Sequence, residues 1–253
     1  MKSKYLINIF FLLLFVSVLS YPQEKNSKTL FQSAPFIGLA SGAMNDNFTI
    51  GEISRHGNFG LGTFNGVNGE MIILDGKVYR VSYDGKVSQP SKSERSPFVT
   101  EVFFHADTVI QINKEMDYKT LIEYLDNNLP SKNLIYAIRV IGLFSTVKTR
   151  SIAKQAKPYT DFADVTKNQS TFNFQNIKGT LIGFRFPDYM DGVNVPGYHF
   201  HFLSDNRKSG GHDLEFTANS MKIEIDAVNY FQMRVPKSKD FIKTNFEKKS
   251  IKD

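Results

Sequence analysis

Short apolar runs alternate with turn dipeptides from Gly51 to about Ile110. β-Branched and aromatic residues fill the runs, and the dipeptides between them accept the positive φ angles of tight turns. This pattern predicts β-strands, which are clearest over residues 71–74, 78–81 and 98–104. The turn dipeptides are Asn65-Gly66, Asn68-Gly69, Asp75-Gly76 and Asp84-Gly85.

One helix follows this β-rich stretch. Asp117 can cap it, apolar residues recur from Leu121 to Leu129 with the period of a helix, and Pro130 ends it. Beyond it we expect a strand over 134–147, a loop with a short helix over 154–170, and strands over 180–186, 197–203, 212–216 and 221–228. Strands in hairpin-connected groups with few helices predict an α+β fold of mixed, largely antiparallel β-sheets in two intimately packed subdomains.

The first residues have the pattern of a secretory signal peptide. Lys2 and Lys4 precede an apolar run from Ile7 to Leu19, which is shorter than a membrane-spanning helix needs, and Ser20 is a small residue at the exit. We therefore expect residues 1–20 to be a cleaved signal peptide, which commits the protein to export, to the periplasm or to the medium. No membrane association is expected after cleavage.

The rest of the chain divides into a leader, one main domain and a tail. We assign residues 21–31 to a polar leader, 32–245 to the main domain and 246–253 to a basic tail. Within the main domain we expect a β-rich N-terminal half to about residue 150 and a C-terminal half that carries the candidate metal site.

Glycines at 60 and 62 invite a comparison with dinucleotide-binding loops. Position 65 is Asn65, so the G-x-G-x-x-G pattern fails, and no helix pattern follows it. We expect Gly60 and Gly62 to lie in a bent strand that another backbone approaches closely.

The formal net charge of +6 lies mostly at the chain ends. Lys2 and Lys4 contribute +2, the lysine-rich segment 237–253 contributes +3, and residues 21–236 keep only +1. A nearly neutral body without a basic stripe argues against nucleic acid as a partner.

The chain has no cysteine, which excludes disulfides, thiolate metal sites and cysteine nucleophiles. Any metal must be bound by imidazole and carboxylate. His199 and His201 are two residues apart, so in a strand both imidazoles lie on one face and the phenylalanines between and after them on the other. A hairpin through the turn-rich residues 204–211 would return His212 beside His201. Three neutral nitrogen ligands leave an open position on the metal, which is typical of a catalytic site.

The histidine spacing alone leaves alternatives open. A lone histidine is more often a structural residue than a ligand, and cupins and α-type carbonic anhydrases also place His-x-His pairs on strands. The two remaining histidines, His56 and His105, have no partner at ligand spacing, and we expect both to serve structure.

Three blocks of sequence, in order, resemble the alpha-acetolactate decarboxylase family. The first runs from Asn58 to Glu70 and reads Asn-Phe-Gly-Leu-Gly-Thr-Phe-Asn-Gly-Val-Asn-Gly-Glu. The second is Arg150 followed by Lys-Gln at 154–155 and Lys-Pro-Tyr at 157–159. The third reads Asn-Val-Pro-Gly-Tyr-His-Phe-His-Phe-Leu-Ser-Asp-Asn-Arg over 194–207 and closes with Gly-Gly-His at 210–212. The similarity covers roughly residues 32–245, and cupins and carbonic anhydrases lack the first two blocks.

The resemblance implies a set of site residues. His199, His201 and His212 match the family's zinc ligands, so it implies Zn²⁺ as the cofactor. Glu70 matches a carboxylate at the metal, Arg150 the active-site arginine, and Thr63 a hydroxyl in the same pocket. The family also uses a glutamate near its C-terminus, for which residues 246–253 offer no clear equivalent. Glu247 and Asp253 are the acidic residues there, and neither is assigned.

The resemblance also implies the reaction, which is decarboxylation of (S)-2-acetolactate to (R)-acetoin and CO₂. Loss of CO₂ leaves an enediolate, whose charge a Lewis-acidic zinc stabilises. Arg150 suits the substrate's carboxylate or oxyanion, and Glu70 can deliver the proton that completes acetoin. It further implies a homodimer and a small-molecule substrate, 2-acetolactate. The alternatives are another three-histidine zinc lyase or cupin-type enzyme, or an exported metal-binding module.

Overall fold

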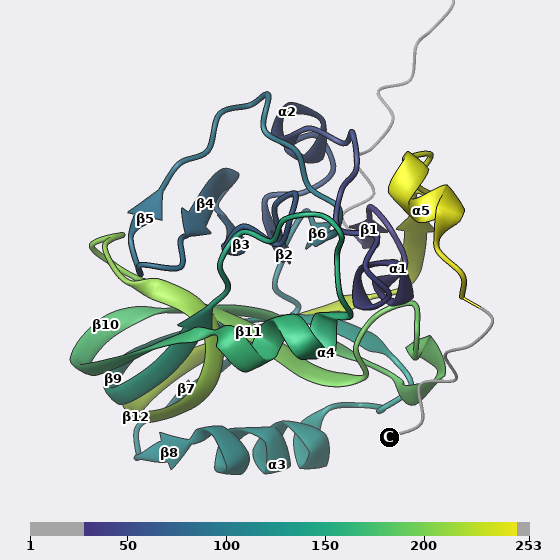
Figure 1. Ribbon diagram of the computed structural model, residues 1–253. Helices are drawn as coiled ribbons and strands as arrows, with labels where there is room; N and C mark the ends of the chain where they lie inside the picture. Colours follow the sequence, from purple (N-terminus) through teal and green to yellow (C-terminus); the bar gives the residue numbers. More distant parts are fainter. Residues whose placement is uncertain (1–27, 247–253) are drawn as a thin grey trace, which may run out of the picture.

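The computed structural model describes residues 28–246, which fold into two packed β-sheets with few helices (Figure 1). The predicted α+β class with largely antiparallel sheets is confirmed. The strands are β1 (Thr29–Gln32), β2 (Phe59–Thr63), β3 (Glu70–Leu74), β4 (Lys77–Val81), β5 (Val87–Ser88), β6 (Val99–Val102), β7 (Thr108–Ile112), β8 (Met116–Asp117), β9 (Ile135–Ser151), β10 (Ser170–Phe186), β11 (Gly197–Ser204), β12 (Gly210–Val228) and β13 (Tyr230–Met233). The helices are α1 (Phe36–Ala40), α2 (Ile50–Ile53), α3 (Tyr118–Asn128), α4 (Phe162–Val165) and α5 (Lys239–Lys243), with single 3₁₀ turns at η1 (Thr166–Asn168) and η2 (Asp188–Met190).

The first sheet has seven strands in the order β13-β1-β6-β2-β3-β4-β5. Its neighbours pair antiparallel except β1 and β13, which pair in parallel. Turns with positive φ at Gly69 and at Asp75-Gly76 flank β3, at two of the four dipeptides that predicted turns. The three strands expected over residues 71–104 are present.

The second sheet has the order β11-β10-β9-β12-β7, and β8 pairs with β12. β11 also pairs with β12, so β9 to β12 close into a ring. The helix α3 covers the outer side of this sheet (Figure 1). Its predicted cap is confirmed, because the Asp117 carboxylate accepts a hydrogen bond from the Thr120 amide at 2.8 Å, and Leu121 and Leu125 are buried.

The main core lies between the two sheets. Leu30, Phe59 and Ile72 of the first sheet pack there with Ile182 and Phe184 of the second. A second cluster, which includes Phe200 and Phe202, fills the space between the second sheet and α3. Side chains of the two sheets therefore meet at the face from which the site is built.

Gly60 and Gly62 confirm the expected close approach of another strand. A Cβ atom at Gly60 would lie 2.4 Å from the Thr100 carbonyl oxygen, and one at Gly62 would lie 2.4 Å from that of Phe98. Both contacts are with β6 or the residue that precedes it, so glycine is required for this pairing.

Some elements differ from the expectations. Residues 29–31, assigned to the leader, form β1, because Leu30 and Phe31 are buried in the sheet. The two strands expected over 212–228 are one strand, β12, which bends at register shifts instead of turning. The helices α1, α2 and α5 were not expected, because four or five residues are too few to show a helical period.

The two sheets do not divide near residue 150. β7 and most of β9 precede that residue and lie in the second sheet, whereas β13 follows it and lies in the first. Each sheet therefore contains strands from before and after residue 150. The division of the main domain into two halves stays a prediction.

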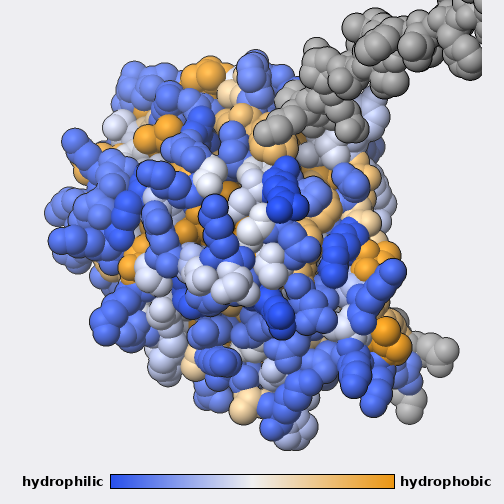
Figure 2. Space-filling model, turned by 90° about the horizontal axis from the view of Figure 1, so that it is seen from above, coloured by the Kyte–Doolittle hydropathy of each residue, from blue (hydrophilic) through white to orange (hydrophobic). Residues whose placement is uncertain are grey.

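The signal peptide predicted for residues 1–20 and all but the first residue of the predicted tail, 246–253, lie outside the described residues. Within residues 28–246 no helix is both long and apolar enough to span a bilayer. Seen from above, the molecule is mostly hydrophilic with small, scattered hydrophobic patches (Figure 2).

Candidate metal centre

The three histidines of the third block meet at one point of the β11–β12 hairpin. His201 lies directly opposite His212 in the antiparallel register, as the hairpin prediction required. His199 is two residues earlier on β11, so it shares the face of His201, whereas Phe200 and Phe202 are buried in the core on the other face. The alternation of β11 thus directs two imidazoles toward the first sheet, and the hairpin adds the third.

The histidine nitrogens have the spacing of a metal site. One nitrogen from each ring lies within 4.8 Å of the others, and His199 Nε2 is 3.0 Å from His212 Nδ1. Two nitrogens bound to one tetrahedral zinc at about 2.05 Å are roughly 3.3 Å apart. The residues therefore fit a metal ion with three nitrogen ligands, although their geometry does not identify the metal.

Burial favours the neutral form of the three imidazoles, which is the form that binds a metal. Burial, together with the Arg150 charge, lowers the pKa of His199 from its ordinary value of 6.5 to about 3. Burial lowers the pKa values of His201 and His212 well below 6.5 as well. His201 Nδ1 lies 2.8 Å from the Met71 carbonyl oxygen, to which it donates as a neutral ring, so its Nε2 keeps a free lone pair.

Glu70 and Arg150 form a buried ion pair beside the histidines. Arg150 Nη1 donates to Glu70 Oε1 at 2.8 Å, and Glu70 Oε2 lies 3.6 Å from His201 Nε2. Burial raises the pKa of Glu70 above its ordinary 4.5, and the Arg150 guanidinium opposes that rise. A carboxyl group held this way can carry a proton near the metal position.

Thr63 lies opposite Glu70 in the β2–β3 register. Its hydroxyl donates to the Gly69 carbonyl at 2.8 Å, across the turn that leads into β3. Thr63 lines the same cavity as Glu70, Arg150 and the three histidines, and the volume of this cavity is about 360 Å³. The structure therefore brings together all six residues that the resemblance implies.

Further residues of this cavity were missed by the sequence analysis. Phe36 of α1 and Phe162 of α4 form part of its wall, and Tyr118, Tyr198 and Asp213 line it as well. The two phenylalanines belong to helices of four or five residues, which give no periodic signal. Tyr198 and Asp213 are each next to a ligand candidate, His199 and His212, and this adjacency was the clue that the sequence offered.

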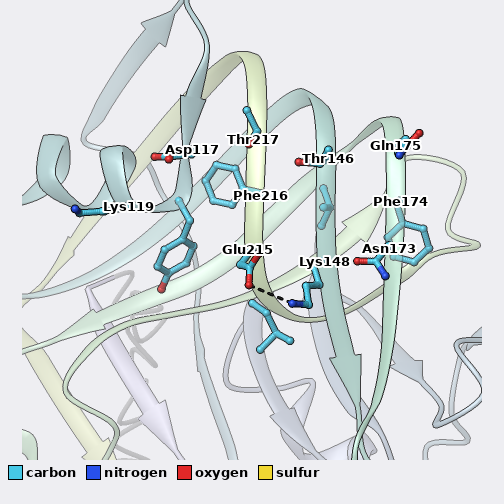
Figure 3. Close-up of a pocket in the computed structure, with 13 residues that line it drawn as sticks. Asp117, Lys119, Thr146, Lys148, Asn173, Phe174, Gln175, Glu215, Phe216 and Thr217 are labelled. Atoms are coloured by element: carbon cyan, nitrogen blue, oxygen red, sulfur yellow. Dashed lines mark hydrogen bonds and ion pairs between the residues drawn. The ribbon is translucent and has the colours of Figure 1, made fainter.

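A second hollow lies on the second sheet, at the ends of β9, β10 and β12 (Figure 3). Its volume is about 540 Å³, and it is lined by Phe174 and Phe216 with a rim of polar side chains. Lys148 and Glu215 on this rim pair with each other at 3.2 Å. The histidines lie in the other cavity, so that cavity is the candidate for the chemistry.

His56 and His105 lie away from the cavity. The His56 ring stacks on Phe31 with ring centres 3.8 Å apart, and the backbone amide of His105 donates to Asp226 at 2.8 Å. These contacts are consistent with the structural roles expected of them.

Comparisons with known proteins identify the family. Residues 30–248 match the family model described as alpha-acetolactate decarboxylase. A curated alpha-acetolactate decarboxylase of Methanosarcina mazei is 42% identical over 215 residues, which cover 85% of this chain and 75% of that protein. One of Bacillus subtilis is 36% identical over 233 residues, which cover 92% of this chain and 91% of that protein. The chain belongs to the alpha-acetolactate decarboxylase family.

Solved structures agree with this membership. The alpha-acetolactate decarboxylase of Bacillus subtilis strain 168 superposes with a TM-score of 0.85 at 36% identity, over 87% of this chain and 94% of that chain. A Staphylococcus aureus protein described as similar to alpha-acetolactate decarboxylase superposes with a TM-score of 0.83 at 30% identity, over 86% of this chain and 94% of that chain. The protein is therefore an enzyme, a carboxy-lyase of this family, rather than a cupin-type enzyme or a binding module.

The acidic residues considered for the family's C-terminal glutamate, Glu247 and Asp253, lie outside the described residues.

Proposed function

We propose that the protein decarboxylates (S)-2-acetolactate to (R)-acetoin and CO₂ with a zinc ion bound by His199, His201 and His212. The observation that carries this proposal is the position of three converging neutral nitrogens beside the Glu70–Arg150 pair in one cavity. Membership of the alpha-acetolactate decarboxylase family supports the reaction. Three histidine ligands agree with zinc as the metal.

The reaction breaks the bond between C2 of the substrate and its carboxylate carbon. The electron pair of that bond moves toward the neighbouring carbonyl, CO₂ leaves, and C2 of the resulting enediolate takes one proton to give acetoin. A bound zinc supplies Lewis-acid stabilisation of the negative charge that develops on the substrate's oxygens.

Arg150 is the candidate for orienting the substrate. Its guanidinium remains charged in the buried site and offers several donors, of which Nη1 is used on Glu70 at 2.8 Å. The remaining donors can bind the carboxylate that leaves as CO₂ or the oxygen that gains charge. Binding by Arg150 would fix the orientation of the bond between C2 and the carboxylate carbon, which is the bond that breaks.

Glu70 is the candidate proton donor. Burial favours its protonated form, and its carboxyl group lies between Arg150 and His201 at 2.8 and 3.6 Å. It delivers its proton to C2 of the enediolate from the side of the first sheet and regains one from water. Delivery from one side gives one enantiomer of acetoin.

The test is turnover of racemic acetolactate by zinc-loaded protein that lacks residues 1–20. We expect release of CO₂, formation of one acetoin enantiomer, the (R) form, and consumption of half the substrate in the fast phase. Absence of CO₂ release would overturn the proposed reaction, and racemic acetoin would overturn the role of a fixed proton donor.

We also propose that the protein forms a homodimer. The strand β13 supports this, because it is the edge of the first sheet and exposes Tyr230 and Phe231, which are 58% and 38% accessible. Sedimentation equilibrium measures the mass directly, and a monomer at micromolar concentration would contradict the proposal.

We propose export as well, on the basis of residues 1–20. N-terminal sequencing of protein recovered outside the cytoplasm is expected to start shortly after Ser20. Recovery of chain beginning at Met1 from the cytoplasm alone would contradict it.

A further inference from the structure

The cavity is covered on one side by a connecting segment between β9 and β10, residues 154–168, which we call the closing segment. Its helix α4 carries Phe162, which lines the cavity, and Val165, which is buried in a cluster with Leu39 and Val67. In Figure 1 α4 lies at the front, between the two layers and beside α1. The closing segment is therefore a wall of the active site that belongs to neither sheet.

Two contacts hold this wall against the first-sheet layer. The backbone amide of Gln155 donates to the Gly66 carbonyl at 2.7 Å. The Phe162 ring meets Phe36 of α1 edge to face, with centres 6.1 Å apart. Between Gln155 and Phe162 the closing segment has a further, polar support.

That support comes from α5, whose residue Asp240 lies 83 residues after Lys157 in the sequence. Lys157 Nζ donates to Asp240 Oδ1 at 2.5 Å, and Asn45 Nδ2 donates to Asp240 Oδ2 at 3.0 Å. Asn45 Nδ2 also donates to the Tyr159 hydroxyl at 2.7 Å. Asp240 thus joins the closing segment to the loop after α1, and its side chain is only 17% exposed.

The helix α5 is itself seated on the wall of the cavity. Its N-cap Ser238 accepts a hydrogen bond from the Phe241 amide, and the Phe241 ring lies against Gly38 of α1. A Cβ atom at position 38 would be 2.9 Å from Phe241 Cε2, so this approach depends on glycine. Asp240 is consequently fixed relative to α1, whose residues Phe36 and Leu39 line the cavity.

We propose that Asp240 is a positioning residue of the enzyme. Through Lys157 and Asn45 it holds the closing segment over the cavity, and release of this network opens a path for substrate and product. Ion pairs with one exposed partner are weak, and the Lys157 side chain is 59% exposed, so the network can open during turnover. Closure excludes water from the charge that develops in the site.

The test combines hydrogen exchange with steady-state kinetics on the full chain. In Asp240→Ala, the amides of Gln155 and Val165 are expected to exchange about five-fold faster, since an ion pair of this exposure shifts an opening equilibrium by about that factor. KM for acetolactate is expected to rise by a similar factor of about five while kcat stays within about two-fold. Lys157→Gln alters only the exposed partner of the ion pair and is also expected to raise the exchange rates and KM. This variant provides the test if Asp240→Ala does not fold.

A charge exchange supplies the rescue. Lys157→Asp combined with Asp240→Lys restores the ion pair, and Asn45 can then accept from Lys with its amide oxygen. The double variant is expected to recover the wild-type KM and exchange rates, whereas Lys157→Asp alone is expected to be the weakest binder. A merely structural role of α5 would lower stability without this pairwise rescue.

The matched control is Asp84→Ala, which breaks the exposed pair with Lys86 at 2.8 Å in the β4–β5 turn. It is expected to leave KM and exchange of the closing segment unchanged. Unchanged exchange in Lys157→Gln, or failure of the charge exchange to restore KM, overturns the proposal. Hydrogen exchange needs no turnover, so this result is separate from success or failure of the proposed reaction.

Discussion

The two sheets contribute different chemistry to the same cavity. The first presents oxygen groups, because Thr63 and Glu70 are paired neighbours on β2 and β3. The second presents nitrogen groups in one row, because Arg150 pairs with His212 and His212 with His201. At the cavity, hydrogen bonds cross between the sheets from Arg150 to Glu70 and from His201 to the Met71 carbonyl, each 2.8 Å long.

This difference separates metal binding from proton transfer. The nitrogen row lies within one sheet and is built largely from a single hairpin, to which the first sheet adds the Met71 carbonyl as the partner of His201 Nδ1. The carboxyl group reaches that site only through packing of the sheets. Variants on the two sides should therefore fail in different ways, and the following predictions test that separation.

The largest effect is expected from His199→Ala on the second sheet. Removing one of three ligand candidates should abolish tight metal binding and lower activity by about a thousand-fold, since Lewis-acid stabilisation is worth several kcal/mol. Metal analysis and an acetoin assay on the same sample measure both. The control is His105→Ala, an exposed histidine away from the cavity, which should keep metal and activity. Full activity in His199→Ala would contradict a role of the metal in the reaction.

A smaller but still large effect is expected from Glu70→Gln on the first sheet. The amide keeps the shape but cannot donate a carboxyl proton, so kcat should fall by about a hundred-fold or more. Metal content should stay at the wild-type level, which distinguishes this variant from His199→Ala. Glu215→Gln, at an exposed glutamate of β12, is the matched control and should leave kcat unchanged. Loss of metal in Glu70→Gln would show that the two sheets are not separable.

The smallest effect is expected at Glu101, a second buried carboxyl group of the first sheet, which can be compared with Glu70. Glu101 of β6 is fully buried, and neither of its oxygens has a hydrogen-bond partner among the described residues. Burial raises the pKa of Glu101 well above its ordinary 4.5, and no arginine opposes the rise as Arg150 does at Glu70. Burial therefore favours the protonated form of Glu101 in the folded protein.

The sign of its pH dependence follows from this raised pKa. The folded protein keeps a proton that the unfolded chain loses above pH 4.5, so the contribution of Glu101 to stability is greatest below pH 4.5 and falls as the pH rises toward the folded-state pKa. The loss is about 1.4 kcal/mol per pH unit in that window. Glu101→Gln removes this proton, so the free energy of unfolding of the wild type should fall relative to that of the variant between pH 5 and 7. Denaturant unfolding at both pH values checks this, and parallel losses would contradict it.

Much of the fold was predictable because its signals are local. The turn dipeptides marked the ends of β3 and β4, and Asp117 with the spacing of Leu121 and Leu125 marked α3. Local sequence signals did not predict the elements whose structure depends on packing with distant segments. β1 is a strand because Leu30 and Phe31 enter the sheet between β6 and β13, partners that are distant in sequence.

The site shows the same division. Alternation on β11 and a turn-rich loop were enough to bring His199, His201 and His212 together. Glu70 and Arg150 are eighty residues apart in sequence, and they were assigned only through the resemblance of whole blocks. Neither the place of Phe162 in the cavity nor the pairing of Lys157 with Asp240 gave a signal, because both depend on the short helices α4 and α5, whose positions are set by packing of distant segments.

The most direct test of the account is removal and return of the metal. Protein without residues 1–20 is stripped with a chelator, dialysed, and assayed for acetoin before and after addition of one equivalent of Zn²⁺. The account predicts activity within a few per cent of background in the stripped protein and recovery with zinc, with unchanged circular dichroism throughout. Full acetoin formation by protein that contains no metal would contradict it.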